Sequence, residues 1–155
     1  MNYHLAQINI SRLIAPLDDP KIAEFVSQLE PINALADKAL GFVWRLQSES
    51  GNAADIPITW YRRVKGEPSS VVLSRTPSGR YHVSSKLCCI FRDRAKWFEK
   101  AVKPGYCLWW IPSGHIPTVA EGRERLEHYQ KHGATPHSFW FSEPFPQPTD
   151  EGVCV

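Results

Sequence analysis

The sequence lacks the features that place a chain in a membrane or in a secretory pathway. No run approaches the roughly 18 apolar residues that a membrane-spanning helix requires. The first ten residues, MNYHLAQINI, do not follow the basic and then apolar pattern of a secretory signal. We therefore expect a cytoplasmic protein without a membrane partner.

The sequence also has few cysteines and none of the common cofactor motifs. Of its four cysteines, Cys88 and Cys89 are adjacent, Cys107 lies in an apolar run and Cys154 lies near the end. No C-x-x-C pair and no Cys/His spacing typical of zinc is present. Dinucleotide, P-loop, nucleophile-elbow and H-E-x-x-H motifs are absent as well. The sequence thus predicts neither a metal nor a cofactor.

What is present is the composition of one globular domain. Hydrophobic residues make up 43% of the chain and aromatic residues 12%, which is typical of a folded rather than a disordered protein. A chain of 155 residues can bury one core but is too short for two ordinary domains. We expect residues 1–155 to form a single domain.

Apolar periodicity in the first third of the chain predicts a strand, a helix and a second strand. Alternation over residues 4–10 indicates the first strand, and apolar residues at three- and four-residue spacing from 22 to 36 indicate the helix. Asp18-Asp19-Pro20 can start this helix, and Pro31 should kink or split it. The aromatic and branched segment 42–47 predicts the second strand.

The last third of the chain gives clearer signals. Residues 91–102 have the pattern of the end of a helix. The apolar run 106–111 gives the clearest signal for a strand in the whole sequence. Thr118-x-x-Glu121 is a capping box that opens a helix ending near His132, where Gly133 is a stop signal. The aromatic segment 138–148 predicts a strand followed by coil, and we expect residues 147–155 to be disordered.

Residues 60–90 differ in composition from the rest of the chain. This block has six Lys/Arg and one acidic residue, a charge of +5, whereas the remainder has 12 basic and 15 acidic residues. Such a block invites interpretation as a nucleic-acid-binding segment. It has neither interleaved aromatic and basic residues nor a known motif, so we predict no nucleic-acid partner. The segment Ser-Ser-Val-Val-Leu-Ser within it can still form a short strand.

The order of elements predicts an α+β fold. If the block supplies a strand and the start of a second helix, the order becomes β-α-β-β-α-β, the ferredoxin-like split βαβ unit. An extra C-terminal helix and an aromatic tail follow. The helices of such a unit cover one face of the sheet, so the other face needs a partner. We expect a homodimer through this sheet face, with Trp44, Trp109 and Trp110 as candidate contacts.

Several segments resemble a family of bacterial proteins. HLAQINISR, PLDDP, GFVWRLQ, FRDRAKWFEK, LWWIPSGHIPTVAEGRERLEHYQKHG and FWFSEPFP are similar to the family called domain of unknown function 3291. The resemblance covers residues 4–58 and 91–146. It implies a fold of the dimeric α/β-barrel type, which includes antibiotic-biosynthesis-type monooxygenases and enzymes that oxygenate without a cofactor. Such an analogy is only a weak guide to chemistry.

The resemblance lapses over the same block that differs in composition. The family has a strand and then a helix there, whereas Thr76-Pro77-Ser78-Gly79 would break a helix. Codons allowed for residues 76–91, read one base out of frame, can encode a helix-like segment that resembles the family. We therefore hypothesise two compensating single-base shifts, near Thr59 and near Ile90, and expect poor packing between them.

The candidate functional residues lie outside this block. His115 follows the strongest strand at a turn, where an imidazole could transfer a proton near neutral pH, or it could simply cap local backbone. Arg45 could bind a substrate carboxylate, or it could be a solvated surface arginine. His4 and Asn9 lie on the first strand and could line a pocket between the sheet and the helices.

Two functional classes follow from these residues. Trp44, Trp97, Trp109 and Trp110 could form a pocket for a flat ligand, or they could belong to the core or a dimer interface. The first class is a monooxygenase-like or isomerase-like enzyme acting on a small, largely apolar or aromatic molecule, with His115 as the catalytic residue. The alternative is a non-catalytic homodimer that binds a small molecule or is structural. The sequence specifies neither a substrate nor a reaction.

Overall fold

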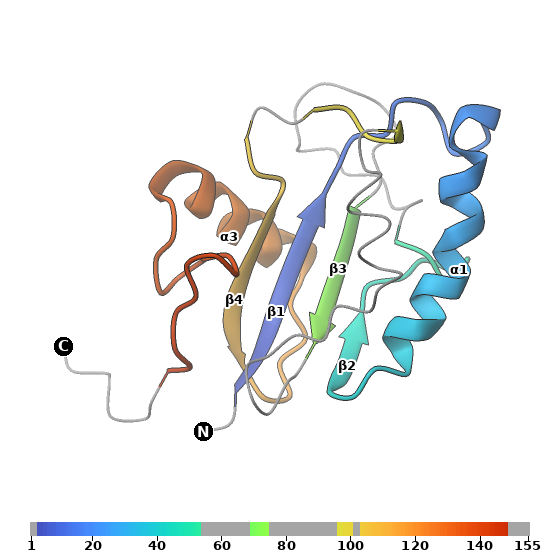
Figure 1. Cartoon of the computed structure of the whole chain (residues 1–155). Helices are drawn as coiled ribbons and strands as arrows, with labels where there is room; N and C mark the ends of the chain where they lie inside the picture. Colours follow the sequence, from blue (N-terminus) through green and yellow to red (C-terminus); the bar gives the residue numbers. More distant parts are fainter. Residues whose placement is uncertain (1–2, 54–68, 75–95, 101–102, 149–155) are drawn as a thin grey trace.

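The computed structural model describes residues 3–53, 69–74, 96–100 and 103–148 of the chain (Figure 1). These residues form a mixed α/β structure, which confirms the predicted α+β class. Its elements in chain order are β1 (Tyr3–Ile10), the 3₁₀ helix η1 (Pro20–Ile22), α1 (Ala23–Asp37), β2 (Phe42–Arg45), β3 (Ser69–Ser74), β4 (Tyr106–Pro112) and α3 (Val119–His132).

The four strands in the described part of the chain form one antiparallel sheet in the order β2-β3-β1-β4. The first strand of the chain is therefore an inner strand, in which Leu5 lies opposite Trp110 of β4 and Ser74 of β3. Strand β3 is the segment Ser-Ser-Val-Val-Leu-Ser, as its composition predicts, although it lies inside the unusual block 60–90.

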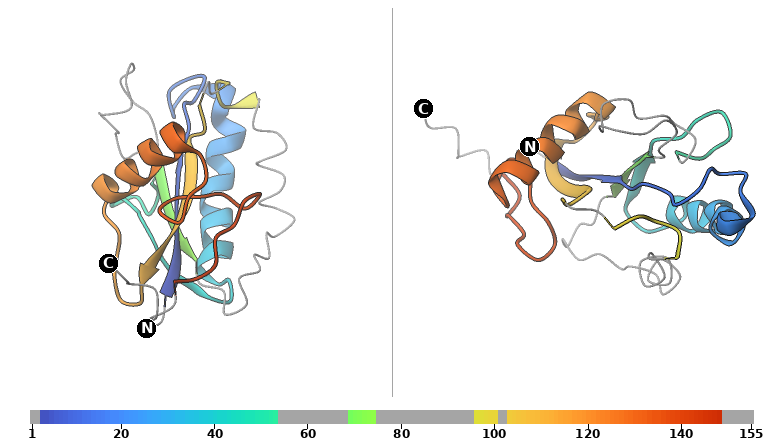
Figure 2. Two further views of the ribbon diagram at one scale, coloured as in Figure 1. Left: turned by 90° about the vertical axis from the view of Figure 1, so that its left-hand side faces the viewer. Right: turned by 90° about the horizontal axis from the view of Figure 1, so that it is seen from above.

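The two α-helices of the described residues, α1 and α3, lie on opposite faces of the sheet. Figure 2 shows the sheet edge-on in its left view, with α3 on one side and α1 on the other, and the view from above agrees. Helix α3 lies over β1 and β4. Helix α3 is the C-terminal helix predicted in addition to the split βαβ unit. It thus covers part of the sheet face that we expected to contact a second copy of the chain.

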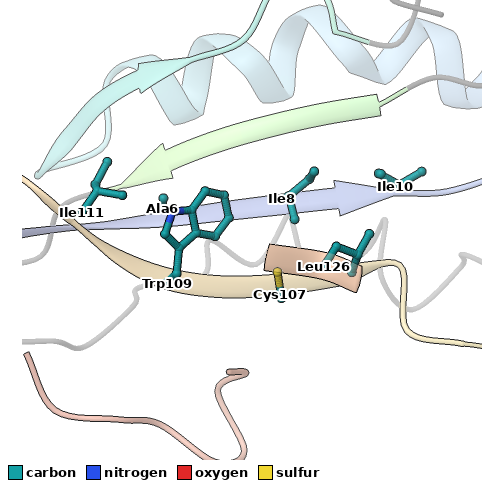
Figure 3. Close-up of a cluster of buried hydrophobic side chains, with 7 residues drawn as sticks. All are labelled: Ala6, Ile8, Ile10, Cys107, Trp109, Ile111 and Leu126. Carbon is teal, nitrogen blue, oxygen red and sulfur yellow. The ribbon is translucent and has the colours of Figure 1, made fainter. Parts of the chain in front are cut away.

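The main core lies between α3 and the sheet (Figure 3). Alternate residues of β1 and β4 point toward the helix because successive strand residues face opposite sides. The buried members of this cluster are Ala6, Ile8, Ile10, Cys107, Trp109, Ile111 and Leu126. Gly122 lets the helix approach closely, since a Cβ there would lie only 2.7 Å from Ile8 Cδ1.

Two further clusters lie outside this core. One joins the start of α1 to the residues after β1 and includes Leu13, Ile22, Phe25 and Trp97. The other contains Leu5, Leu108 and Phe139. Phe139 belongs to the segment Ala134–Phe145 that follows α3, which we call the strap. Its backbone pairs with the outer edge of β4 through hydrogen bonds of 2.8 and 2.9 Å between Leu108 and Phe139.

Several predicted helix ends are confirmed. Asp19 accepts a hydrogen bond of 2.8 Å from the Lys21 amide and caps η1, which leads into α1. Thr118 caps α3, and Gly133 ends it with a positive φ of 73° that glycine adopts without strain. Of the two outcomes predicted for Pro31, the split is wrong, because α1 runs through this residue, and the kink stays a prediction. Proline removes one backbone donor from the helix but does not end it here.

Two other predictions need correction. Residues 96–100, predicted as the end of a helix, instead run beside the segment after β1, where Phe98 bridges Leu13 and the Ile14 amide bonds the Trp97 carbonyl. Burial of Trp97 against Phe25 outweighs the local helical pattern. The tail forms single bridges rather than a strand. The rest of the helix predicted over 91–102, most of block 60–90 and residues 149–155 lie outside the described residues.

Candidate functional site

The turn between β4 and α3 positions the candidate site. Strand β4 ends at Pro112 and α3 begins at Val119. Thr118 adopts an extended conformation, and its hydroxyl accepts a hydrogen bond of 3.1 Å from the Glu121 amide. This is one half of the predicted capping box. It fixes the first turn of α3 and therefore the position of the Glu121 side chain.

The Glu121 carboxylate joins the loop to the sheet. One oxygen lies 2.7 Å from His115 Nε2, and the other accepts a hydrogen bond of 3.0 Å from Trp109 Nε1. The Trp109 side chain is fully buried in the main core, so it is a rigid donor. His115 remains accessible, with 45% of its side chain exposed. We call His115, Glu121 and Trp109 the turn site.

The environment of Glu121 favours its ionised form. Burial raises the pKa of this carboxyl, but hydrogen bonds from His115 and Trp109 and the nearby charges of His115 and Arg125 lower it more. The net effect is a pKa below the ordinary value of 4.5. Glu121 is therefore a fixed negative charge at neutral pH.

This charge determines the tautomer of His115. An ionised carboxylate only accepts hydrogen bonds, so Nε2 of His115 must carry the proton that lies between them. The lone pair of the neutral imidazole is then on Nδ1. Among the residues that the structure describes, no hydrogen bond to this nitrogen is found. His115 thus combines a ring oriented by a fixed carboxylate with an available basic nitrogen.

Ser113 and His4 lie beside the same turn. The Ser113 hydroxyl is 3.2 Å from His4 Nε2, which connects the start of the turn to β1. His4 is a buried residue of β1, opposite Ile111 of β4. His4, which was predicted to bind a substrate, is therefore buried and contacts the turn through Ser113. Ser113 is the exposed member of this pair.

The structure places Arg45 in a different contact from those that the sequence suggested. Its guanidinium makes two hydrogen bonds to Asp37, of 2.7 and 3.1 Å, and one of 2.6 Å to the Gly51 carbonyl. Only 12% of its side chain is exposed, so the solvated alternative is wrong. The hydrogen bonds from Arg45 lower the pKa of Asp37 and outweigh its desolvation. Arg45 thus ties β2 to the end of α1, and its role toward a substrate stays a prediction.

The tryptophans do not form one pocket. Trp109 faces α3 together with Trp44, whereas Trp110 faces the opposite side and donates a hydrogen bond of 3.0 Å to the Phe145 carbonyl. Adjacent residues of a strand point to opposite faces, so this separation follows from their positions. Trp97 belongs to a third cluster, next to α1.

Asn9 lies far from the turn site along β1. It falls on the strand face opposite to His4, because the two positions differ by an odd number of residues. Its side-chain oxygen is buried without a hydrogen-bond partner. The structure therefore does not bring Asn9 and His4 to one pocket.

Other kinds of site find no support in the described residues. No group of three or more His, Cys, Asp or Glu residues within them is arranged to hold a metal ion. Burial raises the pKa of the Cys107 thiol to about 12, so this thiol stays protonated and unreactive. No helix in the described ranges is long and apolar enough to cross a membrane.

The sequence reasoning identified His115 but missed its partner. Glu121 was assigned to helix capping, because Thr118-x-x-Glu121 is a complete capping box. His115 lies just before this capping box, in the turn that leads into α3. This closeness in sequence is the signal that could have revealed Glu121 as its partner. Ser113 carried no signal of its own, since its partner His4 is distant in sequence and close only in the folded sheet.

Comparisons with known proteins yield a family and no function. No curated protein and no solved structure matches the chain. The profile of one family, described as Domain of unknown function (DUF3291), matches residues 4–153 and so spans nearly the whole sequence. The chain belongs to this family.

Proposed function

We propose that this protein is an enzyme in which His115 transfers a proton to or from a small, largely apolar or aromatic molecule. The observation that carries the proposal is the 2.7 Å contact of His115 with Glu121, a carboxylate that Trp109 holds from the core. A base held by a fixed carboxylate, with its other nitrogen available, has the arrangement required for general acid–base catalysis.

Proton transfer is the step shared by the two predicted reaction types. In an isomerase-like reaction, His115 removes a proton from a carbon next to a carbonyl and returns it at another position, so the formula is unchanged. In a cofactor-independent oxygenation, the carbanion reduces O₂, and a CH₂ group and O₂ become a C=O group and water. The substrate supplies all the electrons in that case. Neither reaction requires a redox cofactor.

Deuterium exchange tests the proposal. A panel of cyclic and aromatic ketones is first screened for binding to the full chain by thermal shift, and a binder should raise the midpoint by several degrees at saturation. Exchange of its acidic C–H protons in D₂O is then followed by ¹H NMR. We expect catalysed exchange, with a loss of about 10²- to 10⁴-fold in His115→Gln. Ligand binding should persist in this variant.

Matched variants separate catalysis from packing. Glu121→Gln keeps the shape of the side chain but removes its charge, and it should reduce exchange less than His115→Gln does. Glu127→Gln makes the same change on an exposed part of α3 and should have no effect. Binding without exchange, or equal exchange in wild type and His115→Gln, would contradict the enzymatic proposal and favour the non-catalytic alternative. A panel without a binder favours the structural alternative.

We also propose the ferredoxin-like arrangement and a homodimer. The strand order β2-β3-β1-β4 with antiparallel neighbours supports the former, because a split βαβ unit has this order. The homodimer was expected to use Trp44, Trp109 and Trp110, but Trp109 is covered by α3 within its own chain. Light scattering during size-exclusion chromatography tests the dimer, and a mass of one chain at micromolar concentration would exclude a stable pair.

The proposed frameshift concerns the gene and has its own test. Its prediction is that resequencing will find a frame change near Thr59 and another near Ile90. Clean reads in the present frame would exclude an error in the determined sequence but not an ancient genuine shift. A frame-restored protein, compared in the same thermal-shift screen, shows whether residues 60–90 limit packing or ligand binding.

A further inference from the structure

A second group of histidines lies along α3, outside the turn site. His128 and His132 are on the helix, and His137 is on the strap. The ring centroids of His128 and His132 are 4.6 Å apart, as are those of His128 and His137. Arg125 and Glu124 lie beside them, and both contact His137. This group joins the strap to α3.

The contacts of His137 require its neutral form. Its Nδ1 lies 2.6 Å from Nη1 of Arg125, and its Nε2 lies 2.9 Å from a carboxylate oxygen of Glu124. Arginine only donates hydrogen bonds, so Nδ1 must accept, and the ring proton must be on Nε2. A second proton on Nδ1 would point at the guanidinium and place two positive charges together. Protonation therefore breaks this contact.

The contacts of His128 favour its neutral form for a similar reason. Its Nε2 lies 3.0 Å from the hydroxyl of Thr135. That hydroxyl oxygen already accepts from the backbone amides of His137 and Ser138, at 3.2 and 3.4 Å. With both lone pairs used, the hydroxyl proton is donated to Nε2 of His128. Burial, followed by the charges of His137 and His132, lowers the pKa of His128, and Glu124 opposes this only in part.

The strap that these residues hold covers apolar parts of the sheet. Ser138 and Phe139 are almost fully buried. Phe139 packs on Leu5 and Leu108 and pairs with the edge of β4. Farther along, Trp140 packs against Tyr106, with centroids 4.1 Å apart and ring planes tilted by 38°. Release of the strap would uncover the edge of β4 and these side chains.

We propose that His128 and His137 form an acid-sensitive latch, which holds the strap on α3 and β4 and releases it when both imidazoles are protonated. His137 faces Arg125, Glu124 and His128 of α3, and His128 faces His132 and Arg125 of α3 and Thr135 and His137 at the strap. At His128, burial and the charges of His137, His132 and Arg125 outweigh the attraction of Glu124 and lower its pKa. At His137, an added proton on Nδ1 would face the Arg125 guanidinium. Release of the strap exposes an apolar surface under acid conditions.

Hydrogen exchange on the full chain tests the latch. The amides of Leu108 and Phe139 report strap release, and that of Ile8 reports the sheet. After correction for intrinsic exchange, lowering the pH from 7.5 to 5.0 should reduce protection at Leu108 and Phe139 about tenfold more than at Ile8. The double variant His128→Gln/His137→Gln keeps neutral polar side chains and should lose this difference. His115→Gln, at the other end of α3, should keep it.

A measurement on the unaltered protein guards against a variant that fails to fold. Long-range ¹H–¹⁵N NMR at pH 7.5 should find His137 neutral with its proton on Nε2, as the Arg125 contact requires. A doubly protonated His137 at this pH would overturn the proposal. So would equal loss of protection at all three amides, or the same pH response in wild type and the double variant.

Discussion

Helix α3 has a histidine group near each end, and both groups include a carboxylate of the helix. At its start, His115 contacts Glu121, which is fixed by the buried Trp109. Farther along, His137 lies between Glu124 and Arg125. In the first group, a proton added to the imidazole leaves its carboxylate contact intact. In the second, a proton added to Nδ1 of His137 would face the Arg125 guanidinium, which is also a donor, so the contact between them breaks.

The hydrogen-bonding partner of each imidazole, rather than the histidine itself, therefore decides what the ring can do. A partner that only accepts hydrogen bonds orients the imidazole and tolerates its charge, which suits reversible proton transfer. A partner that only donates requires the neutral ring, which suits a contact that acid disrupts. Variants that alter one histidine group or both test this contrast, and loss of the support that both groups share should have the largest effect.

The largest effect is expected from loss of the helix anchor that both groups share. Leu126 is buried between α3 and the sheet, so Leu126→Ala should lower the free energy of unfolding by about 2–5 kcal/mol. Urea unfolding measures this change. Leu35→Ala on α1, where the leucine is 39% exposed, is the matched control and should cost much less. Equal effects would mean that α3 is not the common support.

A smaller loss of stability is expected from a change that is confined to the turn site. Trp109→Phe keeps an aromatic ring in the core but removes the donor to Glu121, and it should cost about 1.5–3 kcal/mol, as for other hydrogen bonds to charged groups. Trp44→Phe is the control, because Trp44 packs on the same cluster and its indole makes no hydrogen bond among the described residues. NMR shifts should change at His115 and not at His137. Changes at both would argue against independent groups.

Removal of the helix cap should have a still smaller effect. Thr118→Ala loses the hydrogen bond to the Glu121 amide and should cost about 1 kcal/mol. Thr118→Ser retains the hydroxyl and should be close to wild type in thermal unfolding. The exposed side chain of His115 should become more mobile in Thr118→Ala, whereas the strap should keep its protection. If the serine variant is as unstable as the alanine variant, the cap is not the cause.

The smallest effects are expected in the pH dependence of stability. The two groups should lose their contributions to stability over different pH ranges. The pKa of Glu121 is lowered in the fold, so its contribution is present above its ordinary value of 4.5 and is lost as pH falls below it. The pKa of His128 is also lowered, so its contribution is present above 6.5 and declines as pH falls from there. Unfolding measured from pH 8 to 3 should show both declines.

Two single variants assign these windows. Glu121→Gln should flatten the decline below pH 4.5, and His128→Gln should flatten the decline that begins near pH 6.5. Each variant should leave the other window unchanged. A single decline that both variants alter together would mean that the two groups are coupled through α3.

Much of the fold could be predicted because its signals are local. The cap at Thr118, the stop at Gly133 and the apolar run of β4 depend on residues that are close in sequence. The same local reasoning fails for residues 96–100, where the tertiary burial of Trp97 replaces a helical pattern. It also fails for the tail, where the contact of Phe139 with Leu108 joins segments that no periodicity connects.

The site was predicted only in part for the same reason. His115 could be identified from its place after a strong strand, but the chemistry of its ring depends on Glu121 and on the buried Trp109. For Arg45 the sequence left open a carboxylate ligand or a solvated surface residue, because its partners Asp37 and Gly51 become neighbours only when α1 and β2 are in place. Residue type indicates a capacity for contact, and the fold selects the partner.

The inner position of β1 has a consequence for synthesis of the protein. Of the four described strands, β1 is synthesised first, yet it pairs with both β3 and β4, and its Leu5 lies opposite Trp110. The sheet therefore cannot be completed until most of the chain has been made. Until then, the apolar residues of β1 cannot pack with those of β4. Pairings between distant segments slow folding and prolong the lifetime of aggregation-prone intermediates. Newly made chains should depend on chaperones until β4 has emerged.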